Sequence, residues 1–230
     1  KRIGLIGGGQ LGKMTAQAAR EMGFCINVLD PQPHCSAAMI ADTQLVGDLH
    51  DSDKIRALAR LSDVLTYEIE HVDINTLKAL HDEGYPIFPS PYVLETIQDK
   101  LLQKQTLDQH GIPVPAYQAV DSLTDDYLAA ATFPFVQKAR HGGYDGKGVA
   151  VIKSPADKDK LLQGPSMVEA FIPFKKELAV MIARDAAGAV ACYPIVEMVF
   201  DDRTNICDIV AAPATISTEI AERARAVATQ

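Results

Sequence analysis

A glycine-rich segment near the start of the chain constrains the fold more than any other feature. It spans residues 7–12 and reads Gly-Gly-Gly-Gln-Leu-Gly, between a short apolar run at 3–6 and a helical pattern at 11–22 that ends at Gly23. The spacing G-x-G-x-x-G between a strand and a helix is typical of turns that bind phosphate groups. The sequence therefore predicts a strand–turn–helix unit whose helix N-terminus offers unpaired N–H groups to an anion.

Three interpretations of this turn remain open. Asp30 ends the next predicted strand, where a dinucleotide-binding fold has an acid for the ribose, so an NAD-dependent oxidoreductase is the first. A different phosphate ligand is the second, and a tight turn that needs glycine only for packing is the third. The phosphate interpretation is favoured, because the N–H groups of a helix N-terminus do not specify a dinucleotide.

The first part of the chain alternates short apolar runs with helical patterns. Strands are expected at 3–6, 25–29, 45–46, 64–67 and 85–88, and helices at 11–22, 54–61 and 74–80. Strands that are separated by crossover helices form parallel sheets. We therefore predict a doubly wound, Rossmann-like α/β domain over residues 1–92.

The second part is expected to be organised differently. A single long helix is predicted at 93–110, with Leu101, Leu102 and Leu107 on its apolar side. Closely spaced strands then follow without crossover helices, at 133–138, 149–152, 167–171, 178–183, 190–199 and 207–210. Because strands this close in sequence are typical of antiparallel hairpins, residues 93–230 are predicted to form a second, α+β domain.

The overall charge and the apolar pattern exclude several classes of protein. The formal net charge of −8 argues against electrostatic binding of nucleic acid. No apolar run approaches the ~20 residues of a transmembrane helix, so we expect a soluble, cytoplasmic protein with no membrane partner. The four cysteines form no C-x-x-C pair, and all are expected to be reduced thiols in the core: Cys25, Cys35, Cys192 and Cys207.

A second glycine-rich loop, at 138–149, joins two predicted strands. It is not a P-loop, because Val149 stands where the hydroxyl residue belongs and a strand follows instead of a helix. Its four glycines lie among Lys138, Arg140 and Lys147, and backbone N–H groups together with cations can hold a triphosphate. An ordinary solvated basic hairpin is the alternative, and the concentration of glycines and cations makes it the less favoured one.

Four motifs in a fixed order give the chain a resemblance to a known family. Besides the first glycine turn, it contains T-Y-E-I-E-H-V at 66–72, D-K-L-L-Q-K at 99–104 and G-G-Y-D-G-K-G at 142–148. From residue 1 to about 217 the chain resembles the carboxyaminoimidazole ribonucleotide synthetases, which are ATP-grasp enzymes. The resemblance implies a homodimer with a Rossmann-like domain followed by an ATP-grasp domain. A lid subdomain would span about 112–172, and the ATP-grasp domain is expected to be truncated at its C-terminus.

The resemblance also implies an ATP site in the second domain. Lys100 and Lys138 would contact the phosphates and Glu177 the ribose hydroxyls, while the glycine loop would cover the triphosphate. The implied ATP contacts are Lys100, Lys138, Gly143, Tyr144, Asp145, Gly146, Lys147, Gly148, Val149, Glu169, Ala170, Phe171, Ile172, Glu177 and Phe200. Phe200 stands where many relatives have a histidine, so its ring can stack but cannot donate a hydrogen bond. Taken without the family, Lys100 would be an exposed helix lysine, and Glu169 or Glu177 a sheet-surface acid.

For a second substrate, 5-aminoimidazole ribonucleotide, the resemblance implies a site at the first glycine turn. Gly9, Gln10 and Leu11 would hold its 5′-phosphate at the helix N-terminus. Glu70 would contact the ribose or the amine, although an acid at the end of a strand explains Glu70 equally well.

The implied reaction is an ATP-dependent carboxylation in purine biosynthesis. ATP would phosphorylate bicarbonate, and the substrate amine would attack the resulting carboxyphosphate or carbon dioxide released from it. Tyr144, Asp145 and Lys147 would approach the imidazole and the bicarbonate as catalytic residues. Mg²⁺ would bridge the phosphate oxygens, but the family's metal ligands are expected beyond residue 230, so none is assigned within the chain. A non-catalytic nucleotide-binding fragment is therefore a third functional hypothesis.

Overall fold

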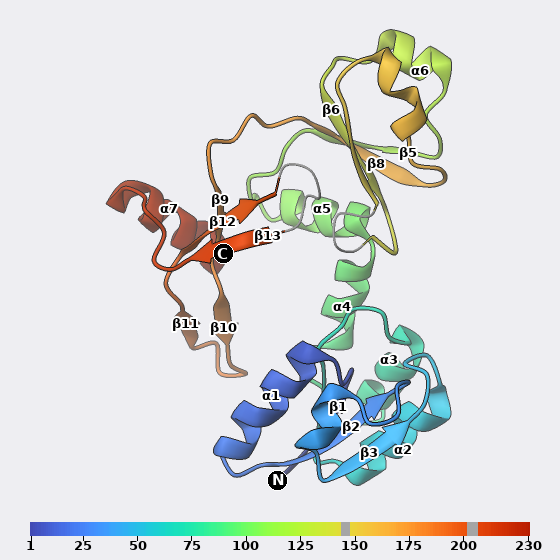
Figure 1. Ribbon diagram of the computed structural model, residues 1–230, viewed down its shortest axis with the longest axis vertical. Helices are drawn as coiled ribbons and strands as arrows, with labels where there is room; N and C mark the ends of the chain where they lie inside the picture. Colours follow the sequence, from blue (N-terminus) through green and yellow to red (C-terminus); the bar gives the residue numbers. More distant parts are fainter. Residues whose placement is uncertain (144–147, 202–206) are drawn as a thin grey trace. The chain divides into compact units, whose positions relative to one another are not determined.

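The protein divides into two compact units, Lys1–Asp99 and Lys100–Gln230. The structure, a computed structural model, describes residues 1–143, 148–201 and 207–230. Figure 1 draws the first unit in blue to green and the second in green to red. The domain boundary that the sequence predicts, after residue 92, falls inside the first unit, and the predicted lid subdomain stays a prediction.

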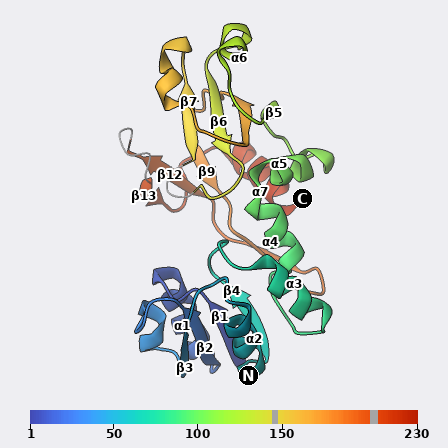
Figure 2. The same ribbon diagram turned by 90° about the vertical axis from the view of Figure 1, so that its right-hand side faces the viewer.

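The first unit is built on a four-stranded parallel sheet in the order β3-β2-β1-β4 (Figure 2). Its strands are β1 (Arg2–Ile6), β2 (Cys25–Asp30), β3 (Thr43–Val46) and β4 (Val64–Tyr67). Its helices are α1 (Gln10–Glu21), α2 (Ser52–Leu61), α3 (Ile74–Asp82) and α4 (Pro91–Gln98), with a 3₁₀ turn η1 at Ser36–Met39. The predicted doubly wound α/β architecture is confirmed. The strand expected at 85–88 is reduced to one parallel bridge between Leu65 and Ile87.

The sheet of the first unit is buried on both faces, which explains its continuous apolar strands. On one face, Ile6, Leu29 and Leu65 pack in a cluster with residues of α2, α3 and α4. On the other, Ile26 packs against Ala16 of α1. The small alanine side chain lets that helix lie close to the sheet.

The second unit begins with α5 (Lys100–Gln109) and contains an antiparallel sheet in the order β5-β8-β6-β7. Its strands are β5 (Tyr117–Val120), β6 (Phe135–Ala139), β7 (Val149–Ile152) and β8 (Ser166–Ala170). Figure 2 shows β6 and β7 side by side as a hairpin, with Lys138 paired to Val149. Because side chains alternate along a strand, Phe135 and Val168 join the core with α6 (Asp125–Ala130), whereas Lys138 and Glu169 face the other side. A 3₁₀ segment, η2 (Pro155–Lys160), follows β7.

The rest of the second unit contains two further antiparallel sheets and the last helix. The hairpin β10 (Ile182–Arg184)–β11 (Val190–Cys192) forms one, and β9 (Glu177–Ala179), β12 (Val196–Phe200) and β13 (Cys207–Ala211) form the other in the order β13-β12-β9. The predicted hairpins are thus confirmed. Helix α7 (Thr218–Thr229) has no buried residue, and the Gln230 amide donates to the His110 carbonyl at 2.8 Å.

The single helix predicted at 93–110 is wrong, because the chain is extended at Asp99 (φ −111°, ψ 108°). That break separates α4 from α5, and the Lys100 N–H donates to the Arg140 carbonyl at 2.9 Å instead of continuing a helical ladder. Leu101 is buried as expected, whereas Leu102 is 38% exposed.

Two predicted strands are each divided into two. The strand expected at 178–183 changes partner, because β9 pairs with β12 whereas β10 pairs with β11. The strand expected at 190–199 is interrupted between β11 and β12, where Pro194 has no N–H to donate to a ladder.

The cysteines are reduced as predicted, but the predicted core location is wrong for Cys25, Cys192 and Cys207. Only Cys35 is buried, whereas Cys25 and Cys192 are exposed and Cys207 is intermediate; all four are free thiols. Apolar neighbours in a strand do not reveal which face a side chain takes, because successive side chains point to opposite faces. At Cys35, burial raises the pKa of the thiol.

Candidate functional site

A pocket of about 290 Å³ opens between α5 and the adjoining face of the β5-β8-β6-β7 sheet. We call it the lysine pocket, and it is lined by Lys100, Gln103, Lys104, Lys138, Val149, Met167 and Glu169. Lys100 and Lys104 are four residues apart on α5, so they lie on the same side of the helix. Lys138 and Glu169 come from the paired strands β6 and β8, on the sheet face away from the core.

Glu169 is at the centre of the charges in this pocket. Only 4% of it is exposed. Its Oε2 atom is 2.7 Å from Lys138 Nζ and its Oε1 atom is 2.8 Å from Lys104 Nζ. Burial by itself raises the pKa of Glu169, but the ammonium groups of Lys104 and Lys138 outweigh burial and hold the pKa below its ordinary value. The carboxylate is therefore ionised at neutral pH.

The pocket as a whole carries a positive charge. Lys104 and Lys138 share the single carboxylate of Glu169, and Lys100 forms no ion pair within the described residues. Three ammonium groups thus face one carboxylate. A concave site with excess positive charge attracts anions, and a polyphosphate gives these cations several oxygens to contact.

The glycine loop between β6 and β7 begins and ends at the edge of this pocket. The Ala139 N–H donates to the Gly148 carbonyl at 2.9 Å, which extends the hairpin ladder. Gly148 has φ +78°, and a Cβ atom there would lie 3.0 Å from the Cα of Gly143, so the two ends of the loop meet too closely for a side chain. The predicted residues Tyr144, Asp145, Gly146 and Lys147 lie outside the described residues.

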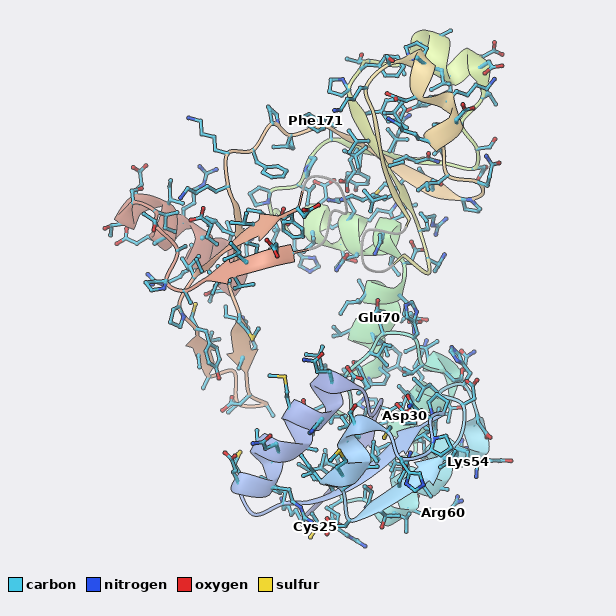
Figure 3. The ribbon with its side chains drawn as sticks, viewed as in Figure 1. Cys25, Asp30, Lys54, Arg60, Glu70 and Phe171 are labelled. Atoms are coloured by element: carbon cyan, nitrogen blue, oxygen red, sulfur yellow. The ribbon has the colours of Figure 1, made fainter. Side chains whose placement is uncertain are left out.

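The predicted adenine segment follows directly from Glu169. Strand β8 ends at Ala170, whose N–H donates to the Ala116 carbonyl at 2.8 Å. Phe171 and Ile172 are exposed, and Figure 3 labels Phe171 on the segment that leaves β8. Phe171 also lines a pocket of about 490 Å³ whose walls include Tyr117, Tyr127, Phe133 and Phe135.

Two predicted ATP contacts lie in another sheet of the second unit. Glu177 is the first residue of β9 and is paired with Met198, whereas Phe200 is paired with Cys207 beside a register shift. Neither of them lines the lysine pocket. The structure therefore brings together Lys100, Lys138, Val149 and Glu169 from the predicted set, and it adds Lys104 and Gln103.

In the first unit, the glycine turn is fixed by close backbone packing and by hydrogen bonds to Asp30. Gly7 has φ +95°, and a Cβ atom at Gly12 would lie 2.5 Å from the Gly7 carbonyl oxygen. The Gly8 N–H donates to Asp30 Oδ2 at 2.7 Å, and Asp30 Oδ1 accepts from the Gln32 N–H at 2.8 Å. Asp30, labelled in Figure 3, therefore ties the glycine turn to the end of β2.

The acid that faces this turn is Glu68, which the sequence interpretation missed. A Cβ atom on Gly7 would lie 2.8 Å from Glu68 Oε1, and one on Gly9 would lie 3.4 Å from the same atom. Burial, together with the nearby Asp30, raises the pKa of Glu68, against a smaller lowering contribution from the Gly9 backbone. The motif T-Y-E-I-E contains both acids, Glu68 first and Glu70 second, and the family resemblance assigned only Glu70 to the substrate.

The other predicted residues of the first unit are divided between two places. Gly9 caps α1 without a side-chain hydrogen bond, and Gln10 and Leu11 are exposed at the start of that helix. Glu70 lies beside α4 (Figure 3), and its carbonyl accepts from the Gln98 amide at 2.7 Å. Glu70 itself is therefore tied to α4 through its backbone.

Comparison with known proteins matches both units to described domain families. Residues 1–98 match the ribonucleotide synthetase preATP-grasp domain, and residues 105–230 match the ATP-grasp domain. The chain belongs to the ATP-grasp family. No helix among the described residues is long and apolar enough to cross a bilayer.

The similar proteins have the names of the family that the sequence motifs resemble. The N5-carboxyaminoimidazole ribonucleotide synthase of Synechococcus elongatus is 38% identical over 234 residues, which cover 99% of this chain and 59% of that protein. A solved N5-carboxyaminoimidazole ribonucleotide synthetase from Thermotoga maritima is 47% identical with a TM-score of 0.87, covering 100% of this chain and 60% of its own.

A third relative was solved with ligands. The N5-carboxyaminoimidazole synthase of Aspergillus clavatus, in complex with ADP and 5-aminoimidazole ribonucleotide, is 32% identical with a TM-score of 0.88. The match covers 100% of this chain and 61% of that one. The chain thus spans about three fifths of the length of these relatives.

Proposed function

We propose that this chain is the ATP-binding part of an ADP-forming ligase that carboxylates 5-aminoimidazole ribonucleotide with bicarbonate, in purine biosynthesis. The observation that carries the proposal is the lysine pocket, in which three ammonium groups face one buried carboxylate at the base of the glycine loop. A nicotinamide-dependent oxidoreductase leaves this pocket without a role, and Asp30, on which that alternative depends, is bound to the glycine turn.

In this proposal ATP lies along the second unit. Lys100 and Lys138 neutralise its phosphates, and the N–H groups at the base of the glycine loop add hydrogen bonds. Residues 170–172, which are exposed, read the adenine through their backbone, Glu177 accepts hydrogen bonds from the ribose, and Phe200 stacks.

5-Aminoimidazole ribonucleotide is assigned to the glycine turn of the first unit. Its 5′-phosphate would occupy the N-terminus of α1 at Gln10 and Leu11, where helix N–H groups have no partner inside the helix. The Gly8 N–H already donates to Asp30, so it is not counted as a phosphate donor. Glu68 provides a carboxylate for the ribose hydroxyls at the same turn.

The chemistry is a phosphoryl transfer followed by an acyl transfer. Bicarbonate oxygen attacks the γ-phosphorus of ATP, and ADP leaves to give carboxyphosphate. The substrate amine then attacks the carboxyl carbon, phosphate leaves and the amine loses one proton. Tyr144, Asp145 and Lys147 are proposed to serve this second step. The contribution of the lysine pocket is positioning and charge neutralisation.

Magnesium normally assists such transfers by bridging phosphate oxygens. The described residues contain no group of three or more histidine, cysteine or acidic side chains that could hold a metal ion, and Glu197 pairs with Lys176 at 2.8 Å. The proposal assigns no magnesium ligand among the described residues. A homodimer and a cytoplasmic location belong to the same proposal.

The test measures binding and turnover separately. Calorimetry with ATP and with NADH should give a signal for ATP only. Release of ADP should depend on both bicarbonate and 5-aminoimidazole ribonucleotide in a version of the chain extended to the length of its relatives. ATP binding without such turnover in the extended version would favour a non-catalytic nucleotide-binding protein, and NADH binding would reject the proposal.

A further inference from the structure

The carboxylate of Glu169 is shared between two lysines that come from different elements. Lys104 of α5 is 2.8 Å from one oxygen and Lys138 of β6 is 2.7 Å from the other. The Lys104 side chain is the less exposed of the two, at 15% against 29%. The two cations therefore have the same partner but differ in their access to the open part of the pocket.

The proposed nucleotide site creates a conflict for this carboxylate. If Lys138 moves to a phosphate oxygen, Glu169 loses one of its two cations while it stays buried. An unpaired buried charge is among the most costly groups in a protein, so a lone Glu169 would hold Lys138 back. Tyr117, the neighbour of Glu169 on β5, gives no relief, because its hydroxyl donates to Asp108 at 3.1 Å.

We propose that Lys104 is the positioning residue that keeps Glu169 neutralised and so releases Lys138 to bind the nucleotide phosphates. This inference rests on the function proposed above for the lysine pocket. Lys104 acts through Glu169 and does not itself contact the ligand, which distinguishes it from Lys100. Lys100 lines the same pocket but forms no ion pair within the described part of the chain.

The test is a double-mutant cycle on ATP affinity, measured by calorimetry with ATP and magnesium. Lys104→Met should weaken ATP binding by about tenfold, because Lys138 then remains on Glu169. In a Glu169→Gln background the buried charge is gone, so adding Lys104→Met should change ATP affinity less than about twofold. Lys104→Arg should keep wild-type affinity, since it keeps the cation.

A surface variant and a melting curve complete the design. Lys158→Met removes a cation that pairs with Asp125 on the surface, so it controls for the loss of one positive charge. Equal weakening by Lys104→Met in both backgrounds would show a direct phosphate contact and overturn the proposal, as would unchanged ATP affinity in the single variant. If Lys104→Met fails to fold, the ATP affinities of Glu169→Gln and of the double variant are compared instead, since neither carries an unpaired carboxylate. A loss of affinity in the double variant would show a direct phosphate contact and overturn the proposal. Absence of ATP binding by the wild-type chain would instead reject the proposed function.

Discussion

The backbone N–H of Gly8 donates a 2.7 Å hydrogen bond to Oδ2 of Asp30, and this contact ties the first glycine turn to the end of β2. Gly8 is buried, so its N–H has no access to water when the acceptor is removed. We expect Asp30→Ala to lower the free energy of unfolding by about 1–3 kcal/mol, the cost of an unsatisfied buried donor. Urea denaturation measures it, with the exposed Glu21→Ala as a control that should stay within about 0.5 kcal/mol of wild type.

A second prediction concerns Lys138. Lys138→Ala should weaken ATP binding by about 1.5–3 kcal/mol, the usual size of a hydrogen bond to a charged group. The same substitution should also lower stability, because Lys138 pairs with the buried Glu169. Since Lys104 remains as a partner, we expect a loss of only about 1 kcal/mol in the free energy of unfolding. Calorimetry and denaturation of the same sample test both parts, and unaltered ATP affinity would remove Lys138 from the site.

Much of the fold was predictable because local signals and tertiary contacts agree. The apolar runs before Gly7 and before Asp30 formed the expected parallel strands, since both are buried on two faces. The break at Asp99 was not predictable, because the Lys100 N–H finds its acceptor in Arg140, on a distant strand end. No local pattern around residue 99 records that contact.

The candidate site was predictable where the local pattern of a strand or helix determines which side chains share a face. Lys138 and Glu169 are polar positions that alternate with core positions along their strands. This alternation indicates that both lie on the sheet face away from the core. Lys104 could have been found from its spacing of four residues from Lys100 on one helix. Whether Glu68 or Glu70 faces the glycine turn depends on the register in which Ile6 pairs with Tyr67, and sequence patterns do not give a register.

The base of the glycine loop gives a third prediction. Gly148→Ala should lower both stability and ATP affinity, because φ is +78° and a Cβ atom would lie 3.0 Å from Gly143. Gly164→Ala is a matched control, since Gly164 has φ +84° but nothing within 4 Å of a Cβ atom. Both variants carry the backbone strain of about 1 kcal/mol, so the difference between their unfolding free energies isolates the contact with Gly143. Identical losses in the two variants would mean that the loop ends separate freely.

The pH dependence of stability follows from Glu169. Its pKa is lower in the folded chain than the ordinary value of about 4.3, because two ammonium groups outweigh burial. The stabilisation by the ionised form is therefore complete above the ordinary pKa and is lost as the pH falls through the folded-state value. We expect the free energy of unfolding of the wild type to fall as the pH is lowered from about 5 to about 3. The fall should be steeper than that of Glu169→Gln over the same range. Parallel curves of unfolding free energy against pH for the two proteins would show that the ion pairs of Glu169 with its lysines do not stabilise the fold.

The last prediction separates the two acids of T-Y-E-I-E by their positions at the glycine turn. The Glu68 carboxylate lies against Gly7 and Gly9, just before α1, whereas Glu70 is fixed beside α4 through its carbonyl. Glu68→Gln keeps the shape but removes the charge that would accept hydrogen bonds from ribose hydroxyls. It should therefore weaken binding of 5-aminoimidazole ribonucleotide by about 1.5–3 kcal/mol, and Glu70→Gln by less than about 0.5 kcal/mol. ATP affinity, measured on the same samples, should not change in either variant, because neither acid lines the lysine pocket. If Glu70→Gln has the larger effect, the ribose is held beside α4, and the turn at Gly9 binds the phosphate without help from Glu68.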